Sequence, residues 1–180
     1  MPARPADIPA EVETVRSFVN TLDLGEGTDE LGTPTALSRW LRDAGLVAKA
    51  VPASGRDLAM AHKLRAALRG ELGANHGRTP DPAATERLDA VLLQLPLTAA
   101  TGGDEGLVPT VPGIRGAFAQ IAVLVATARI KGTWPRLKVC EGEACGWAFY
   151  DPSRGRTKRW CSEVCAGRPA GRASREAAPS

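Results

Sequence analysis

Residues 140–165 read CEGEACGWAFYDPSRGRTKRWCSEVC and contain all four cysteines of the 180-residue chain, Cys140, Cys145, Cys161 and Cys165. The cysteines form two close pairs in the pattern C-x4-C-x15-C-x3-C. Each short pair can fold as a tight turn that brings two sulfurs together, and the longer interval has room for a β-hairpin. The spacing therefore predicts that four sulfurs meet at one point.

Four converging thiolates are the ligand set of a structural zinc ion, which binds its ligands tetrahedrally at about 2.3 Å. The N-terminal segment MPARPADIPA has no apolar stretch of the kind found in signal peptides. We therefore expect a cytoplasmic protein, and in a reducing compartment disulfides do not persist. One structural Zn²⁺ is the expected cofactor. Disulfides, unliganded thiols and an iron–sulfur cluster, which uses other cysteine spacings, stay open as alternatives.

The sequence between the cysteine pairs predicts a hairpin and then a helix. Residues 147–150 (WAFY) favour a short strand, residues 151–155 (DPSRG) a turn, and residues 156–160 a return strand. The second cysteine pair contains no turn residue and is expected to open a helix, whose N–H groups would stabilise thiolate charge. This order of knuckle, hairpin and helix is typical of a treble-clef finger.

A module of this size cannot bury enough apolar surface to fold alone. Structural zinc contributes on the order of 10–16 kcal/mol to the folding of finger peptides, so we expect the metal to hold this part of the chain together. Three aromatic residues are expected to form a miniature core, with base stacking as their alternative role: Trp147, Phe149 and Trp160.

Catalysis is not expected. An all-cysteine site leaves zinc no open coordination position, and the H-x-E signature of zinc deaminases is absent from the sequence. No activated nucleophile motif or phosphate-binding glycine loop is present either. The two histidines, His62 and His76, lie far upstream of the cysteines, and we expect surface or packing roles for both.

Upstream of the cysteines, apolar residues recur at helical spacing in five segments. Thr33 with Pro34, and Ser54, are typical helix N-caps, as is Asp81 before Pro82. The last segment is apolar almost all round, which predicts a central position, and its apolar run is shorter than the roughly 20 residues that span a membrane. The predicted helices cover residues 12–22, 34–44, 55–72, 82–95 and 113–131.

A short hairpin is expected between the last two of these helices, with strands at 97–101 and 107–111 around Gly102, Gly103 and Asp104. The sequence thus predicts an α+β fold in which a mainly helical N-terminal domain with a short β-hairpin precedes a small treble-clef-like zinc finger. The expected boundaries are 1–134 for the N-terminal domain, 135–170 for the finger and 171–180 for a flexible tail.

Positive charge is concentrated near the cysteines. Residues 1–135 hold 14 Lys/Arg and 15 Asp/Glu, whereas residues 136–180 hold 9 and 5, which gives net charges of −1 and +4. A positive surface attracts polyanions in a salt-dependent way. The alternative is that these residues merely solvate a small module. The candidates for nucleic-acid contact are Arg154, Arg156, Lys158, Arg159, Arg168 and Arg172.

The pattern C-x4-C-G-W-A-F-Y-D-x-S-R over residues 140–154, followed by R-W-C-S-x2-C over 159–165, resembles the CGNR zinc-finger family of bacterial proteins. Upstream, F-V-N-T-L-D over 18–23 and L-x-T-P-x2-L-x2-W-L over 31–41 resemble the ABATE-type domain that precedes this finger in the family. Residues 165–168 depart from the family name, because they read C-A-G-R. The cysteine and the arginine are kept, but the asparagine and any contact it makes are lost.

The resemblance implies a transcription regulator, described as stress-induced, whose finger binds nucleic acid. DNA is the expected partner, with RNA as the alternative. A second hypothesis is that the N-terminal domain senses a small-molecule effector through Asn20, Thr21, Asp23 and Trp40, although the first two also suit helix-end capping. A third is that the finger is a protein-interaction module without a nucleic-acid partner. The sequence does not define the oligomeric state.

Overall fold

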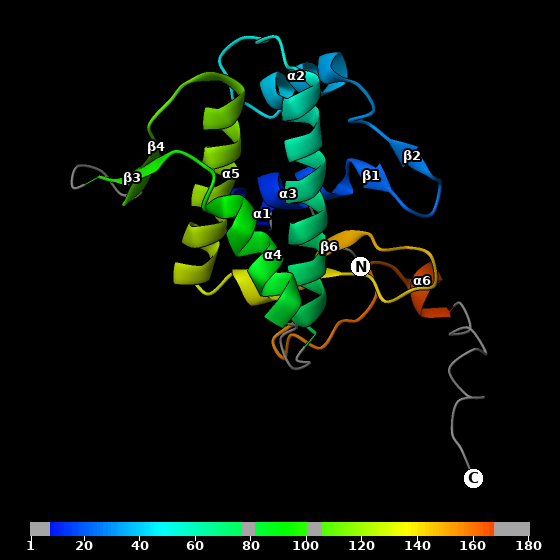
Figure 1. Cartoon of the computed structure of the whole chain (residues 1–180). Helices are drawn as coiled ribbons and strands as arrows, with labels where there is room; N and C mark the ends of the chain where they lie inside the picture. Colours follow the sequence, from blue (N-terminus) through cyan, green and yellow to red (C-terminus); the bar gives the residue numbers. More distant parts are fainter. Residues whose placement is uncertain (1–7, 77–81, 101–105, 168–180) are drawn as a thin grey trace.

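The computed structural model describes residues 8–76, 82–100 and 106–167, and most of this part is helical (Figure 1). The helices are α1 (Ala10–Asn20), α2 (Pro34–Asp43), α3 (Gly55–Ala74), α4 (Pro82–Leu92), α5 (Gly113–Ile130), a 3₁₀ turn at Trp134–Arg136, and the short α6 (Glu163–Gly167). The strands form three antiparallel pairs: β1 (Leu22–Asp23) with β2 (Thr28–Asp29), β3 (Leu97–Ala99) with β4 (Leu107–Pro109), and β5 (Leu137–Val139) with β6 (Ala148–Tyr150). This mainly helical arrangement with short hairpins confirms the predicted fold class.

Two helix starts are fixed by the caps that the sequence predicts. The Thr33 hydroxyl accepts a hydrogen bond from the Ala36 N–H (3.1 Å), and Pro34 occupies the first position of α2. Ser54 and Asp57 form a reciprocal capping box at the start of α3. The predicted cap Asp81 lies outside the described residues. The ends of α1, α2, α3 and α5 fall within two residues of the predicted ones, whereas α4 ends three residues earlier.

Helix α5 lies at the centre of the helical core, as its apolar sequence predicts. Ile114, Phe118, Ile121 and Val125 are buried in one cluster with residues of α1, α2, α3 and α4. By length and composition this helix could cross a membrane, but 56% of it is buried inside the protein. It is therefore the core helix of this fold.

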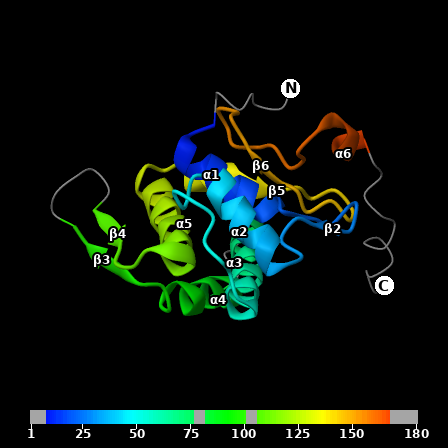
Figure 2. The ribbon, with the colours of Figure 1, turned by 90° about the horizontal axis from the view of Figure 1, so that it is seen from above.

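The hairpin of β3 and β4 is confirmed, with the register Leu97↔Pro109, Thr98↔Val108 and Ala99↔Leu107. Its predicted turn residues lie outside the described part of the chain. Figures 1 and 2 both show this hairpin at one side of the molecule and α6 at the other. The β1–β2 pair, in contrast, was not predicted, because each of its strands contains only two residues.

The predicted partner of strand 147–150 is wrong. Strand β6 pairs with β5, on the other side of the first cysteine pair, in the register Leu137↔Tyr150, Lys138↔Phe149 and Val139↔Ala148. Residues 156–160 form no regular strand, although the Arg159 carbonyl accepts a hydrogen bond from the Glu141 N–H (3.0 Å). The physical reason is burial, since β5 and β6 bring Leu137 and Ala148 into the helical core.

Side chains from α1 and from the two residues that follow α3 complete the outer edges of the β5–β6 sheet. The amide of Asn20 donates to the Ala148 carbonyl (2.9 Å) and accepts from the Ala148 N–H (2.7 Å), so it pairs with β6 as another strand would. On the other edge, Asn75 donates to the Leu137 carbonyl (2.7 Å) and His76 to the Val139 carbonyl (2.6 Å). The core therefore continues past the predicted boundary at residue 134, and that boundary stays a prediction.

We predict that Asn20→Ala lowers the free energy of unfolding by about 2–4 kcal/mol, because it leaves the Ala148 N–H and C=O buried without partners. Chemical denaturation of the zinc-loaded protein measures this loss. The control is Gln94→Ala, which removes an exposed amide that bonds only within its own turn. An Asn20→Ala loss no larger than that of the control would show that this pairing does not stabilise the sheet.

Candidate metal centre and the adjoining basic loop

The four cysteine sulfurs lie within 4.8 Å of one another. The distances between sulfurs are 3.8 Å for Cys145–Cys161, 3.7 Å for Cys161–Cys165 and 3.8 Å for Cys165–Cys145. An ion that binds four sulfurs tetrahedrally at about 2.3 Å places them about 3.8 Å apart, whereas a disulfide needs about 2.05 Å. The sulfurs are thus spaced as ligands of one metal ion, and all four cysteines are free of disulfides.

The first cysteine pair sits on a tight knuckle between β5 and β6. Ala144 and Gly146 adopt left-handed backbone conformations with φ of 55° and 56°. At Gly142 a Cβ atom would lie 3.3 Å from the Cys140 sulfur, so a side chain there would press against the ligands. The Gly142 and Cys161 N–H groups each point at the Cys140 sulfur at 3.4 Å.

The second cysteine pair leads into α6, as predicted. Cys161 precedes the helix and Cys165 lies on it, and the Ser162 hydroxyl caps the turn by accepting from the Cys165 N–H (3.3 Å). Phe149 and Trp147 pack against the cysteine cluster. Knuckle and helix therefore close around the sulfurs from two sides.

The four cysteine thiols need a bound cation in order to ionise together. Burial, together with the neighbouring Cys140, raises the pKa of the Cys145 thiol to about 11. Burial also raises the pKa of Cys161, again with Cys140 beside it. Four sulfurs this close ionise together only when a metal balances their charge. The chemistry of the donors and their geometry both fit one structural zinc ion held by Cys140, Cys145, Cys161 and Cys165.

The predicted aromatic core of the finger is wrong for Trp160. Phe149 is buried and Trp147 half-buried against the cysteines, but Trp160 is 37% exposed and lies outside this cluster. The residue precedes Cys161 in a segment that runs along the surface, since the expected return strand does not form. The Arg159 guanidinium instead lies over the Trp160 ring, 5.4 Å from the ring centroid, in a cation–π contact.

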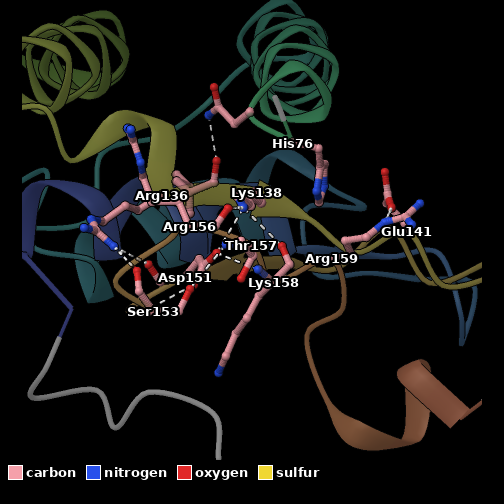
Figure 3. Close-up of polar contacts among 12 residues, drawn as sticks. His76, Arg136, Lys138, Glu141, Asp151, Ser153, Arg156, Thr157, Lys158 and Arg159 are labelled. Carbon is pink, nitrogen blue, oxygen red and sulfur yellow. Dashed lines mark hydrogen bonds and ion pairs between the residues drawn. The ribbon is translucent and has the colours of Figure 1, made fainter. Parts of the chain in front are cut away.

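A buried ion pair that sequence reasoning missed organises the loop after β6 (Figure 3). The ammonium of Lys138 lies 3.0 Å from an Asp151 carboxylate oxygen, with the two side chains 2% and 0% exposed. Lys138 also donates to the carbonyls of Arg156 (2.5 Å) and Lys158 (3.1 Å). Asp151 accepts from the Ser153 hydroxyl and N–H and from the Lys158 N–H. All three ammonium protons and both carboxylate oxygens are thus used.

The bonds of this pair fix the path of residues 151–158, which we call the basic loop. Arg136 adds hydrogen bonds to the carbonyls of Asp151 (3.1 Å) and Ser153 (2.7 Å), which pin the start of the loop to the 3₁₀ turn. Arg156 is held in a left-handed conformation, with φ of 52°. A backbone conformation that L residues seldom adopt persists only where surrounding contacts impose it, and here Lys138 binds the carbonyl of that residue.

The structure brings the four described basic candidates together on and beside this loop. Arg154, Arg156 and Arg159 are exposed and Lys158 is half-buried. Arg159 forms an ion pair with Glu141. Within residues 8–76, 82–100 and 106–167, the guanidinium groups of Arg154 and Arg156 make no ion pair. Arg168 and Arg172 lie outside the described residues.

The small-molecule candidates do not line one pocket. Asn20 pairs with β6, and the Thr21 hydroxyl donates to the Phe18 carbonyl (2.7 Å), which matches the capping alternative. Asp23 accepts from the N–H groups of a turn at Gly25 and Glu26. Trp40 packs against Phe18 and lines a depression that the other three candidates do not reach. The sensing hypothesis stays a prediction.

Both histidines have the packing roles that the sequence predicts. His62 donates to the Leu31 carbonyl (2.9 Å) and His76 to the Val139 carbonyl. Neither belongs to the cysteine cluster.

Comparison with protein families gives two matches. Residues 13–130 match the ABATE family, described as "Putative stress-induced transcription regulator". Residues 136–178 match the CGNR zinc finger. No match was found among curated proteins. The two matches divide the chain between the helical core and the region that carries the four cysteines.

We predict that the purified, reduced protein contains one zinc ion per chain and that Cys145→Ser loses it, because three thiolates no longer complete the tetrahedron. Elemental analysis measures the zinc. Thr157→Ala, a change in the same region at an exposed residue that is no ligand, should keep the full zinc content. Zinc retained by Cys145→Ser at the wild-type level would contradict the assigned ligand set.

We predict that Asp151→Asn lowers the free energy of unfolding at pH 7 by about 3–5 kcal/mol, because it leaves the buried Lys138 charge without its partner. Denaturation of the zinc-loaded variant measures this. Asp43→Asn, which removes a carboxylate from an exposed pair with Arg42, is the control and should cost less than about 1 kcal/mol. Equal losses in the two variants would refute the role of the buried pair.

The same carboxylate predicts a pH dependence. Burial alone would raise the pKa of Asp151, but hydrogen bonds from Ser153, Lys138 and the Lys158 N–H outweigh burial and hold the pKa below its ordinary value. Its contribution is therefore complete above the unfolded pKa of about 4 and is lost as pH falls through the folded pKa. The stability difference between wild type and Asp151→Asn should shrink over that range. Acid release of zinc affects both proteins, so the difference isolates Asp151.

Proposed function

Because the chain belongs to the ABATE family and continues into a CGNR zinc finger, we propose that this zinc-binding regulator binds DNA through the basic loop of its finger. The observation that carries the proposal is the buried Lys138–Asp151 pair, which fixes a loop whose Arg154 and Arg156 side chains are exposed. A rigid loop with guanidinium groups loses little conformational entropy when it contacts phosphates.

The charge distribution favours a polyanionic partner. The region from residue 136 onward has a net charge of +4, whereas the preceding region is slightly negative. Since Arg159 is paired with Glu141, Arg154 and Arg156 are the side chains best placed for phosphate contacts. Contacts of this kind position a protein on DNA without reading its sequence.

The metal centre supports binding rather than catalysis. Four cysteines fill the coordination sphere of a structural zinc ion, so the metal offers no position for a substrate or an activated water. The role of the ion in this proposal is to hold the knuckle and α6 in place. The proposed function is therefore that of a regulator without enzymatic activity. In this regulator β5 and β6 connect the helical domain to the finger.

We predict that the double variant Arg154→Ala/Arg156→Ala binds duplex DNA at least about tenfold more weakly than wild type at 50 mM salt. The slope of log K against log salt should become less negative by about two, because two phosphate contacts are lost. Fluorescence anisotropy at several salt concentrations measures both quantities. Because the protein's own target is unidentified, the probe is a labelled 20-base-pair duplex of mixed sequence.

The control is Arg39→Ala/Arg42→Ala, which removes the same charge from exposed residues of α2, at the opposite end of the molecule in Figure 1. It should bind DNA nearly as wild type does. If both double variants weaken binding equally, the effect is one of net charge and the basic loop is not the interface. If the wild type shows no salt-dependent binding, the finger has another partner, such as a protein.

A further inference from the structure

A shallow groove on the finger surface begins where the basic loop ends. It has a volume of about 550 Å³, and all its lining residues lie between residues 157 and 166. The lining includes Lys158, Arg159, Trp160, Glu163 and Val164. Trp160 is 37% exposed and Val164 67% exposed, so the groove combines an aromatic ring and an aliphatic side chain with basic residues.

In the described part of the finger, Trp160 packs into neither core, and the ring contact that the structure gives it is with the Arg159 guanidinium. The cores of the finger and of the helical domain are both complete without this ring. A large aromatic side chain left at the surface beside cationic groups is the arrangement with which proteins bind unpaired bases, because every base can stack on a ring. The position of Trp160 therefore suits the binding of a base.

The ring is also held in place. The Arg159 guanidinium lies over it, 5.4 Å from the centroid, and is itself paired with Glu141 at the knuckle. The backbone of Lys158, two residues before the ring, is bonded to the buried Lys138–Asp151 pair. A ring whose neighbours are fixed on both the zinc side and the loop side is preorganised for stacking.

We propose that this groove binds an unpaired nucleobase of a single-stranded nucleic acid, stacked on Trp160, while the adjacent basic loop contacts the phosphates of the same strand. The site rests on the function proposed above and adds a substrate class to it. In a duplex the faces of the bases are covered by their neighbours, so they cannot reach the ring. The groove is thus suited to the base, and the basic loop beside it to the phosphates.

The test compares three ligands by fluorescence anisotropy with full-length, zinc-loaded protein: a 12-nucleotide oligothymidine, a 12-nucleotide oligouridine and a 12-base-pair duplex. Trp160→Ala should weaken binding of a single strand by about tenfold, because stacking on that ring is lost. Trp160→Phe should retain most of the affinity, and duplex binding should not change. Binding of either single strand that depends on Trp160 supports the site.

The matched control is Leu93→Ala, which removes an exposed apolar side chain (86% exposed) from the region after α4. Zinc content and thermal stability of each variant show that the finger is intact. Single-strand binding by Trp160→Ala equal to wild type, while Arg154→Ala/Arg156→Ala still loses binding, overturns the stacking site and leaves the proposed function standing. A loss with Trp160→Ala that is equal for single strand and duplex also overturns it. If the wild type binds none of the three ligands, the proposed function itself fails.

Discussion

The β5–β6 sheet constrains the rest of the structure, because its two faces belong to different parts of the molecule. Successive strand residues point to opposite faces. Leu137, Val139, Ala148 and Tyr150 pack with the helical core, whereas Phe149 joins the cysteine cluster and Lys138 joins the basic loop. Its outer edges are closed by Asn20 and by Asn75 with His76. The finger is thus built on the helical domain and not tethered to it.

This arrangement links metal, loop and helices in one chain of contacts. The knuckle that holds Cys140 and Cys145 is the connection between β5 and β6, so zinc stabilises the same sheet that the helices bury. The Lys138 side chain extends from that sheet and binds Asp151 and the loop carbonyls. A buried ion pair seldom adds much stability by itself, and in some proteins its role is to fix one conformation. Here the fixed conformation is that of the basic loop.

Local chemistry could be predicted from the sequence, whereas long-range pairing could not. The cysteine spacing gave the ligand set, and the caps at Thr33 and Ser54 gave two helix starts, because each depends on residues close in the chain. The hairpin between the cysteine pairs was assigned to the wrong partner, since an apolar run such as residues 147–150 does not identify the strand that it meets. Lys138 was missed because a lysine in a short strand ordinarily faces solvent, and the acceptors that bury it lie 13 to 20 residues away. Trp160 was assigned to the core because the sequence around it does not indicate that the expected return strand fails to form.

Duplex DNA affinity as a function of bound zinc, at constant low salt, tests most directly whether the metal centre supports the basic loop. Reduced, metal-free protein is titrated with Zn²⁺ while metal binding and DNA anisotropy are followed together. We expect DNA affinity to appear in step with the first equivalent of zinc and to disappear again on chelation, because the metal holds the sheet that carries the basic loop. Equal DNA affinity in metal-free and zinc-loaded protein would show that the metal centre does not support the interface.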